Sequence, residues 1–287
     1  MKAHGSHVLP IRGLRYHVRT WGNEAAPPLF LLHGWMDVSA SFQFTVDEFQ
    51  HDWHVIAPDW RGFGMSEWTH QGYWFPDYIA DLDALLQHFC PDVPAKLVGH
   101  SMGGNVANLY AGIRPERVEK LVLAEGFGLP ATRPEKAPDR YAQWLGENRQ
   151  LPGLKPYISY DEVAQRLKTN NPRLSDERAQ FLAPHWAEKR SDGRIHLRAD
   201  PCHKMVNPVL YRVEEAMACW KRITAPTLWL WGDGEWVLKW MKGDQALMDS
   251  YRACYQSLRE QTIAESGHMM HLDQPKEFAR AIESFLY

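Results

Sequence analysis

The chain has 287 residues, of which 45% are hydrophobic and 23% charged, a composition that builds a packed core and excludes a disordered chain. This length suits one large α/β domain with an inserted subdomain, or two small domains. The net charge of −3 offers no electrostatic attraction to nucleic acid or to an anionic membrane, so we expect neither as a partner.

Two further features of the composition bear on the environment of the protein. The first residues lack the apolar run of a signal peptide, and no apolar stretch reaches about 18 residues, so no membrane span is predicted. Thirteen tryptophans suggest an aromatic-lined cavity, although aromatic side chains also fill ordinary cores. Without a signal peptide or a membrane span, we expect a cytoplasmic location. No CxxC pair or histidine cluster with zinc spacing occurs, so we expect no metal. We expect reduced thiols at Cys90, Cys202, Cys219 and Cys254.

Short apolar runs alternate with amphipathic segments through the first half of the chain. Polar and apolar residues alternate over 14–21, which predicts a strand, and Arg12-Gly13 before it could turn a hairpin. Apolar residues at helical spacing predict helices at 76–89 and 102–113. Apolar runs predict buried strands at 28–32, 54–57, 96–98 and 118–124. This alternation predicts a mostly parallel sheet that helices cover on both faces.

The strand pattern stops after residue 126. No apolar strand run occurs over 127–222, a stretch rich in charge, proline and aromatic residues, with helix-like segments at 139–149, 160–169 and 175–189. Strands return at 226–231 and 261–264, and a last helix follows from about 275 to 285. We therefore predict an α/β core, 1–126 and 223–287, interrupted after its sixth strand by a helical cap at 127–222.

A candidate nucleophile lies between a predicted strand and a predicted helix. Gly99-His100-Ser101-Met102-Gly103 matches the pattern G-x-S-x-G. The pattern alone arises by chance, but in this context it places the serine on a sharp turn above the sheet. The helix N-terminus behind Ser101 favours negative charge. The alternative is a plain glycine-rich turn.

A serine hydroxyl is a poor nucleophile and needs a base. His268 follows a glycine in a loop just past the last predicted strand, which agrees with the chain order Ser, acid, His. His271 is the rival base, and we expect it instead to cap a helix or to face solvent.

Two glycine-containing segments follow earlier strands. In the first, Gly34 lets the backbone approach a substrate oxygen, and we expect the amides of Trp35 and Met102 to form an oxyanion hole. The alternative is an ordinary strand-ending glycine. The second segment, 59–66, lacks the lysine and the spacing of a P-loop, and we interpret it as a structural turn pinned by its Asp and Arg.

In this order and spacing, HGW, DWRGFGMS, GHSMGG and SGHMMHLDQP resemble the α/β-hydrolase superfamily. The resemblance covers the core, roughly 8–126 and 223–287, and does not extend to the cap. It implies a Ser–His–acid enzyme that acts on esters or related acyl compounds. Superfamily members with Asp in place of the serine are dehalogenases or epoxide hydrolases, and Ser101 argues against both.

Three carboxylates compete for the third position of the triad. Members of the superfamily usually carry the acid after the seventh strand, three residues beyond a glycine, where Glu235 stands; Asp233 lies two residues earlier. Some relatives, including certain haloalkane dehalogenases and cofactor-free ring-cleaving dioxygenases, carry it after the sixth strand, where Glu125 stands. A carboxylate that ends an apolar strand is costly unless it is paired, which favours Glu125.

The function implied is a serine hydrolase, carboxylesterase-like or cleaving C–C bonds, that acts without a cofactor on a small apolar or aromatic acyl substrate through an acyl-enzyme. We expect a monomer or homodimer. The alternatives are a cofactor-independent ring-cleaving dioxygenase and a non-catalytic small-molecule receptor. The candidate pocket residues come from the core and the cap: His33, Gly34, Phe127, Met269, Trp144 and Trp186.

Overall fold

The computed structural model describes residues 1–70, 72–233, 236, 239 and 241–287. Eight strands form one sheet in the order β1-β2-β4-β3-β5-β6-β9-β10. The pairs β1·β2 and β2·β4 are antiparallel and all the other pairs are parallel, which confirms the predicted mostly parallel sheet. The strands are β1 (His4–Ile11), β2 (Leu14–Trp21), β3 (Pro28–Leu32), β4 (His54–Pro58), β5 (Ala95–His100), β6 (Val118–Ala124), β9 (Thr227–Gly232) and β10 (Leu258–Ile263).

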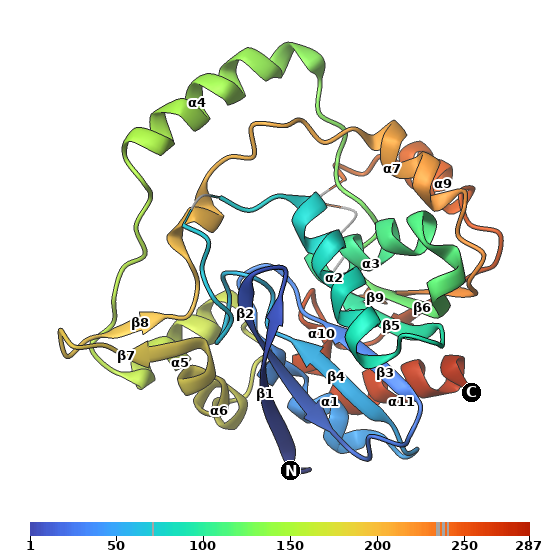
Figure 1. Ribbon diagram of the computed structural model, residues 1–287, viewed down its shortest axis with the longest axis horizontal. Coiled ribbons are helices and arrows are strands. Elements are labelled where there is room, and N and C mark those ends of the chain that lie inside the picture. Colours follow the sequence, from blue (N-terminus) through green and yellow to red (C-terminus); the bar gives the residue numbers. More distant parts are fainter. Residues whose placement is uncertain (71, 234–235, 237–238, 240) are drawn as a thin grey trace.

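Helices cover both faces of this sheet, as predicted (Figure 1). Phe30 and Leu32 of β3 face one hydrophobic cluster, and Leu29 and Leu31 face the other, so the whole strand is apolar. The first cluster includes residues of α2 (Phe75–Phe89), α3 (Met102–Ile113), α7 (Val213–Trp220) and α9 (Gln245–Arg252). The second includes residues of α1 (Gln43–Glu48), α10 (Met270–Asp273) and α11 (Pro275–Leu286).

The sequence predicts the first strand only as the partner implied by a hairpin turn at Arg12-Gly13, without bounds. Among the described strands β1 pairs with β2 alone, at the edge of the sheet, and its side chains alternate between exposed and half-buried until Ile11. An edge strand of this kind buries little apolar surface, so no apolar run marks it in the sequence.

Between β6 and β9 the chain leaves the sheet. This segment contains α4 (Ala137–Arg149), α5 (Tyr160–Asn170), α6 (Asp176–Trp186) and a hairpin of β7 (Ala187–Lys189) and β8 (Ile195–Leu197) before it reaches α7. The hairpin corrects the expected helix over 175–189, because the chain past Trp186 pairs with β8. A three-residue strand is too short for its pattern to be recognised.

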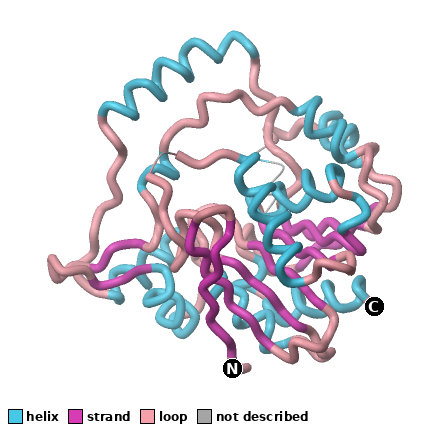
Figure 2. The backbone as a smooth tube through the Cα atoms, in the orientation of Figure 1, coloured by secondary structure: helices cyan, strands magenta, loops and turns pink. Residues whose placement is uncertain are grey.

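The helices of this segment are buried to different extents. α5 and α6 pack against each other around their own hydrophobic cluster, and α7 packs against α3 of the core. No residue of α4 is buried, and the helix lies apart from the sheet with long loops on both sides (Figure 2). Among the described residues, no helix combines the length and the apolar character needed to cross a membrane.

Candidate active site

Ser101 occupies a strained turn between β5 and α3. Its φ of 50° and ψ of −117° are unusual for a residue with a side chain, and such a backbone costs about 1–3 kcal/mol. Close backbone contacts enforce the turn. A Cβ on Gly99 would lie 2.5 Å from the Cα of Gly104, and a Cβ on Gly103 would lie 2.2 Å from the carbonyl oxygen of Leu32. Any larger residue at these two positions would therefore clash with the backbone.

The imidazole of His268 contacts Glu125. Its Nδ1 lies 2.7 Å from Oε2 of Glu125, so the ring donates to the carboxylate and leaves Nε2 able to accept a proton. The other carboxylate oxygen, Oε1, accepts from the amide of Gly232 at 2.9 Å. Glu125 is only 4% exposed, so both oxygens of a buried carboxylate have a donor. Trp236 stacks on the His268 ring with the ring centroids 3.8 Å apart.

The rival carboxylates are placed differently. Asp233 is exposed, accepts from the amide of Glu265 at 2.6 Å and lies 3.4 Å from Arg173. It ties the loop after β9 to the loop after β10. Glu235 lies outside the described residues. Of the described candidates, Glu125 is the one whose carboxylate is hydrogen-bonded to His268.

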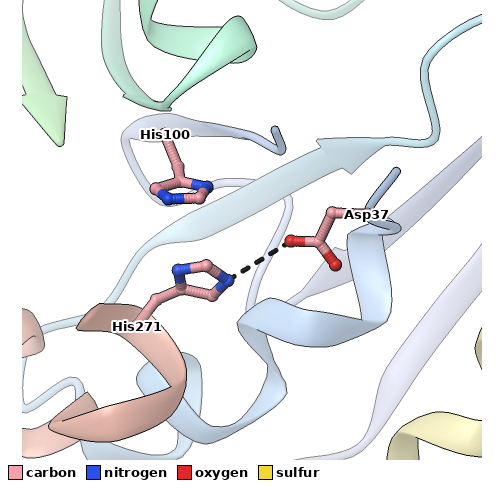
Figure 3. Close-up of side chains that lie close together, drawn as sticks. All are labelled: Asp37, His100 and His271. Carbon is pink, nitrogen blue, oxygen red and sulfur yellow. Dashed lines mark hydrogen bonds and ion pairs between the residues drawn. The ribbon is translucent and has the colours of Figure 1, made fainter. Parts of the chain in front are cut away.

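A buried polar cluster joins the histidine loop to the serine turn (Figure 3). His100, the residue before Ser101, donates from Nε2 to the carbonyl oxygen of His268 at 2.8 Å. Its ring centroid lies 4.5 Å from that of His271, whose Nε2 lies 3.3 Å from Oδ2 of Asp37. Burial, and then the neighbouring histidines, hold the pKa of His100 well below its usual value. His100 is therefore neutral at pH 7, and its hydrogen bond ties the backbone of His268 to the residue that precedes Ser101.

This cluster corrects the expectation that His271 caps a helix or faces solvent. The side chain is fully buried. All four residues of α10 are buried because this short helix packs against α11 and α1. The partners Asp37 and His100 come from segments far away in the chain, so no local pattern around His271 predicts them.

Histidine and aspartate can also ligate metals. The candidate ligand atoms of Asp37, His100 and His271 lie within 4.8 Å of one another. Nε2 of His271 already pairs with Oδ2 of Asp37 at 3.3 Å, so the three residues form a hydrogen-bonded cluster as they stand.

The backbone at Gly34 approaches the serine closely. A Cβ on Gly34 would lie 3.1 Å from Cβ of Ser101 and 2.9 Å from Nδ1 of His100. Met102 is the first residue of α3, where backbone N–H groups lack an acceptor within the helix. These positions fit an oxyanion hole made by the amides of Trp35 and Met102. The Trp35 side chain itself is 53% exposed.

Two of the expected pocket residues belong to the interior instead. His33 is fully buried, donates from Nδ1 to the carbonyl oxygen of Gly34 at 2.7 Å and accepts at Nε2 from the amide of Trp60 at 2.9 Å. Burial also lowers its pKa, although Asp37 opposes the shift. Phe127 stacks on Trp229 within the core. Their side chains have no free surface to offer a substrate, which corrects the expectation that they line the pocket.

The other pocket candidates are partly accessible. Trp186 and Met269 are half-buried and pack against the cluster of α5 and α6. Trp144 is half-buried on α4. The indole nitrogens of Trp144 and Trp186 are buried without a hydrogen-bond partner among the described residues. These three side chains remain candidates for the pocket wall.

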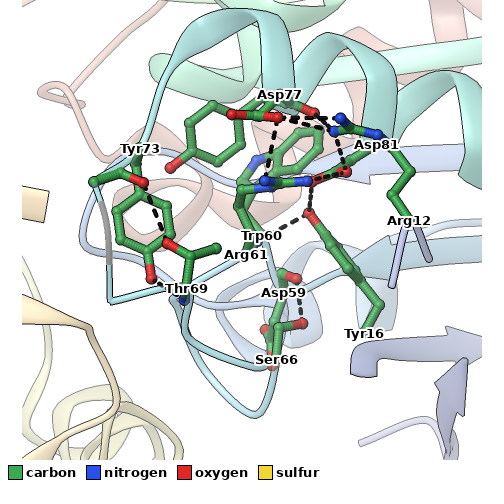
Figure 4. A network of polar contacts seen from close by, with 12 residues as sticks. Arg12, Tyr16, Asp59, Trp60, Arg61, Ser66, Thr69, Tyr73, Asp77 and Asp81 are labelled. Carbon is green, nitrogen blue, oxygen red and sulfur yellow. Dashed lines mark hydrogen bonds and ion pairs between the residues drawn. The ribbon is translucent and has the colours of Figure 1, made fainter. Parts of the chain in front are cut away.

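The turn over 59–66 has the structural role that its sequence predicts (Figure 4). Arg61 makes two hydrogen bonds of 2.5 Å to the buried carboxylate of Asp81, which also accepts from the Tyr16 hydroxyl at 2.9 Å. Asp59 accepts from the amide of Met65 at 2.9 Å. The partners Asp81 and Tyr16 are invisible in the motif, because α2 and β2 supply them.

A sequence model described as the alpha/beta hydrolase fold matches residues 27–275. The serine hydrolase-like protein of Danio rerio is 28% identical over 282 residues, which cover 93% of this chain and 84% of that protein. Epoxide hydrolase 4 of Homo sapiens is 26% identical over 288 residues, which cover 96% of this chain and 76% of that protein.

Solved structures are also similar. The thioesterase domain from the curacin biosynthetic pathway superposes with a TM-score of 0.85 at 23% identity, covering 98% of this chain and 99% of that one. An esterase of Mycobacterium tuberculosis superposes with a TM-score of 0.75 at 19% identity, covering 100% of this chain and 92% of that one. At these identities the likeness shows the fold.

Proposed function

Because the chain belongs to the alpha/beta hydrolase fold family, we propose that it is a serine hydrolase that cleaves an ester or related acyl bond of a small apolar or aromatic substrate. The observation that carries the proposal is the 2.7 Å hydrogen bond between His268 and the buried Glu125. His100 holds this pair against the strained turn of Ser101. The nucleophile, the orienting acid and the base then follow the ends of three strands of one sheet, β5, β6 and β10.

The reaction follows from these roles. Ser101 attacks the substrate carbonyl carbon while Nε2 of His268 takes the hydroxyl proton, and Glu125 stabilises the imidazolium. The amides of Trp35 and Met102 donate to the oxyanion of the tetrahedral intermediate. His268 then returns the proton to the leaving group, and the acyl-enzyme forms. Water, deprotonated by His268, releases the acid and restores Ser101.

One observation also suits a second function. Glu125 follows the sixth strand, where some cofactor-free ring-cleaving dioxygenases of the superfamily carry their acid. In such an enzyme His268 and Glu125 would deprotonate a heteroaromatic substrate, and Ser101 would only hydrogen-bond to it. Oxygen uptake during turnover separates this function from hydrolysis.

The test is a panel of p-nitrophenyl esters of increasing acyl length, assayed with wild type and Ser101→Ala. We expect the variant to lose on the order of 10³-fold or more in turnover, while its circular dichroism and melting temperature stay nearly unchanged. A fluorophosphonate probe should label wild type and not the variant. A variant that keeps more than a tenth of the rate would rule out Ser101 as nucleophile, and failure of the probe to label wild type would favour a non-catalytic receptor.

A further inference from the structure

A small cavity of about 50 Å³ lies between the core and the inserted segment. The core contributes Arg19 of β2 and the segment following β3, and the inserted segment contributes the end of α6 and the residue after β8. Neither Ser101 nor His268 is among the described residues that line it. Its polar lining consists of Arg19, Ser39, Asp59, His185 and Arg198.

The guanidinium of Arg19 is buried without sufficient partners. The residue is only 4% exposed, and its Nε and Nη1 have no hydrogen-bond partner among the described residues. Among the described residues, the guanidinium has one side-chain hydrogen bond, a long one of 3.5 Å from Nη2 to Nδ1 of His185. Arginine keeps its charge even where burial lowers its pKa, as it does here. A buried cation with unpaired donors is costly, so the cavity calls for an acceptor.

The neighbouring carboxylate of Asp59 is already engaged. Its Oδ1 accepts from the amide of Ser39 at 2.7 Å, and its Oδ2 accepts from His17 at 2.7 Å and from the amide of Met65 at 2.9 Å. The hydroxyl of Ser39 is a second buried group without a partner among the described residues. The cavity therefore presents unused donors, and its one lining carboxylate is held by other groups.

The charges around the cavity balance, but the hydrogen-bond donors of Arg19 do not find acceptors. Burial, and then the charge of Arg19, lower the pKa of His185 to about 4, so this ring is neutral at pH 7. Arg198 has its own partner outside the cavity, Glu188, at 3.2 Å. The charge of Asp59 then opposes that of Arg19, and what remains unmet is the need of Nε and Nη1 of Arg19 for an acceptor.

We propose that this cavity binds one small carboxylate anion, of the size of formate or acetate, through Nε and Nη1 of Arg19 and the hydroxyl of Ser39. One water needs roughly 10–15 Å³, so a volume of about 50 Å³ has room for an anion of three or four heavy atoms. It is too small for a nucleotide or a sugar phosphate. Hydrogen bonds between a guanidinium and a carboxylate are among the stronger ones in proteins.

An entry path for an anion lies next to the cavity. A surface cleft of about 500 Å³ shares Met65 and Arg198 with it, which makes the two spaces adjacent. Three arginines and two glutamates line the cleft, so it carries an excess of positive charge: Arg15, Arg190, Arg198, Glu67 and Glu188. A positively charged cleft raises the local concentration of anions.

The consequence is that a bound anion joins the inserted segment to the core, because both parts line the cavity. A ligand that binds only the folded chain stabilises it by mass action. The melting temperature should therefore depend on the concentration of the anion. This inference does not depend on the proposed hydrolase activity.

The experiment measures melting temperature at pH 7.5 against sodium acetate, with ionic strength held constant by sodium HEPES, whose ring cannot enter the cavity. Above the dissociation constant, wild type should gain roughly 2–3 °C for each tenfold rise in acetate. Arg19→Met, which keeps the length of the side chain without its charge, should give a flat line. Arg15→Met is the matched control: it removes the same charge from the same strand but lines only the outer cleft, and it should keep the wild-type slope.

A flat line for wild type would show that the cavity holds only water and would overturn the proposal. Equal slopes for wild type and Arg19→Met would overturn it too, since acetate would then act elsewhere. If Arg19→Met fails to fold, Ser39→Ala provides the comparison and should weaken acetate binding about tenfold. Crystals soaked in sodium bromide give a direct check: an anomalous peak beside Arg19 is expected, and its absence would contradict an anion site.

Discussion

Replacing Glu125 by glutamine tests the proposed acid by exchanging one carboxylate oxygen for an NH₂ group. The carboxylate accepts from the Gly232 amide through Oε1 and from His268 Nδ1 through Oε2. The Gly232 N–H needs an acceptor, so the oxygen of the new amide must stay on that side. Its NH₂ group then faces Nδ1 of His268 and must donate to it.

The consequence is a change of tautomer. A ring that accepts at Nδ1 carries its proton on Nε2, and Nε2 can then no longer take the proton of Ser101. The imidazolium also loses its charged partner. We expect Glu125→Gln to lower the turnover number by roughly two to four orders of magnitude, or about 3–5 kcal/mol of barrier.

The assay is the turnover number on the best p-nitrophenyl ester, with circular dichroism and melting temperature as checks on folding. Asp233→Asn and Glu235→Gln are the isosteric controls, and each should cost about tenfold or less. The reasoning is refuted if Glu125→Gln keeps more than a tenth of the turnover, or if Glu235→Gln is the more damaging change. Severe losses in both variants would mean that the two carboxylates share the role.

Three further predictions concern the base, selectivity and pH. His268→Gln should lower ester hydrolysis by roughly 10³-fold or more, because Ser101 then has no base; a variant with wild-type turnover would show that another group is the base. Trp144→Ala and Trp186→Ala should redistribute relative rates across the ester panel rather than abolish them, and unchanged relative rates would remove these residues from the pocket wall. Burial lowers the pKa of His203 to about 3. In the unfolded chain, this imidazole takes up a proton as the pH falls through about 6.5, whereas in the folded chain it stays neutral. The free energy of unfolding is therefore highest above that pH and falls by about 2 kcal/mol at pH 5 because of His203. His203→Phe, which keeps the stacking on Phe63 and Tyr73, should remove that part of the loss in urea unfolding measured at pH 7 and pH 5; an unchanged difference between the two pH values would contradict it.

The buried strands could be predicted from the sequence because burial on both faces leaves a continuous apolar run. β3 and β6 show this plainly, and their predicted bounds match the structure. The bounds of β1 and the hairpin of β7 and β8 could not be predicted, since neither buries enough side chains to leave a pattern. The glycine-rich turn at Ser101 was readable for a different reason, because close backbone contacts restrict which residues fit.

The partners of buried polar groups were beyond the sequence. From its place one turn past His268, the sequence predicts that His271 caps a helix or faces solvent, and only the fold brings Asp37 to it from the segment after β3. The same is true of Asp81, which reaches Arg61 from α2. A motif identifies the residue that needs a partner, whereas the partner itself depends on which elements meet in space.

Two buried acid–histidine pairs show what separates the proposed catalytic pair from a structural one. Asp59 with His17 and Glu125 with His268 both have a 2.7 Å hydrogen bond to Nδ1. Burial alone would raise the pKa of Asp59, but the hydrogen bond from His17 and nearby charges hold it well below its usual value.

The two pairs differ in how exposed their imidazole rings are. The His17 side chain is 1% exposed and its Nε2 is bound to Ser6, whereas the His268 side chain is 21% exposed. A carboxylate can orient any buried imidazole, but only a ring with an accessible second nitrogen can exchange a proton with a substrate or a nucleophile. Pairing therefore explains why both acids tolerate burial, and the partial exposure of the His268 side chain is what makes its pair the candidate for chemistry.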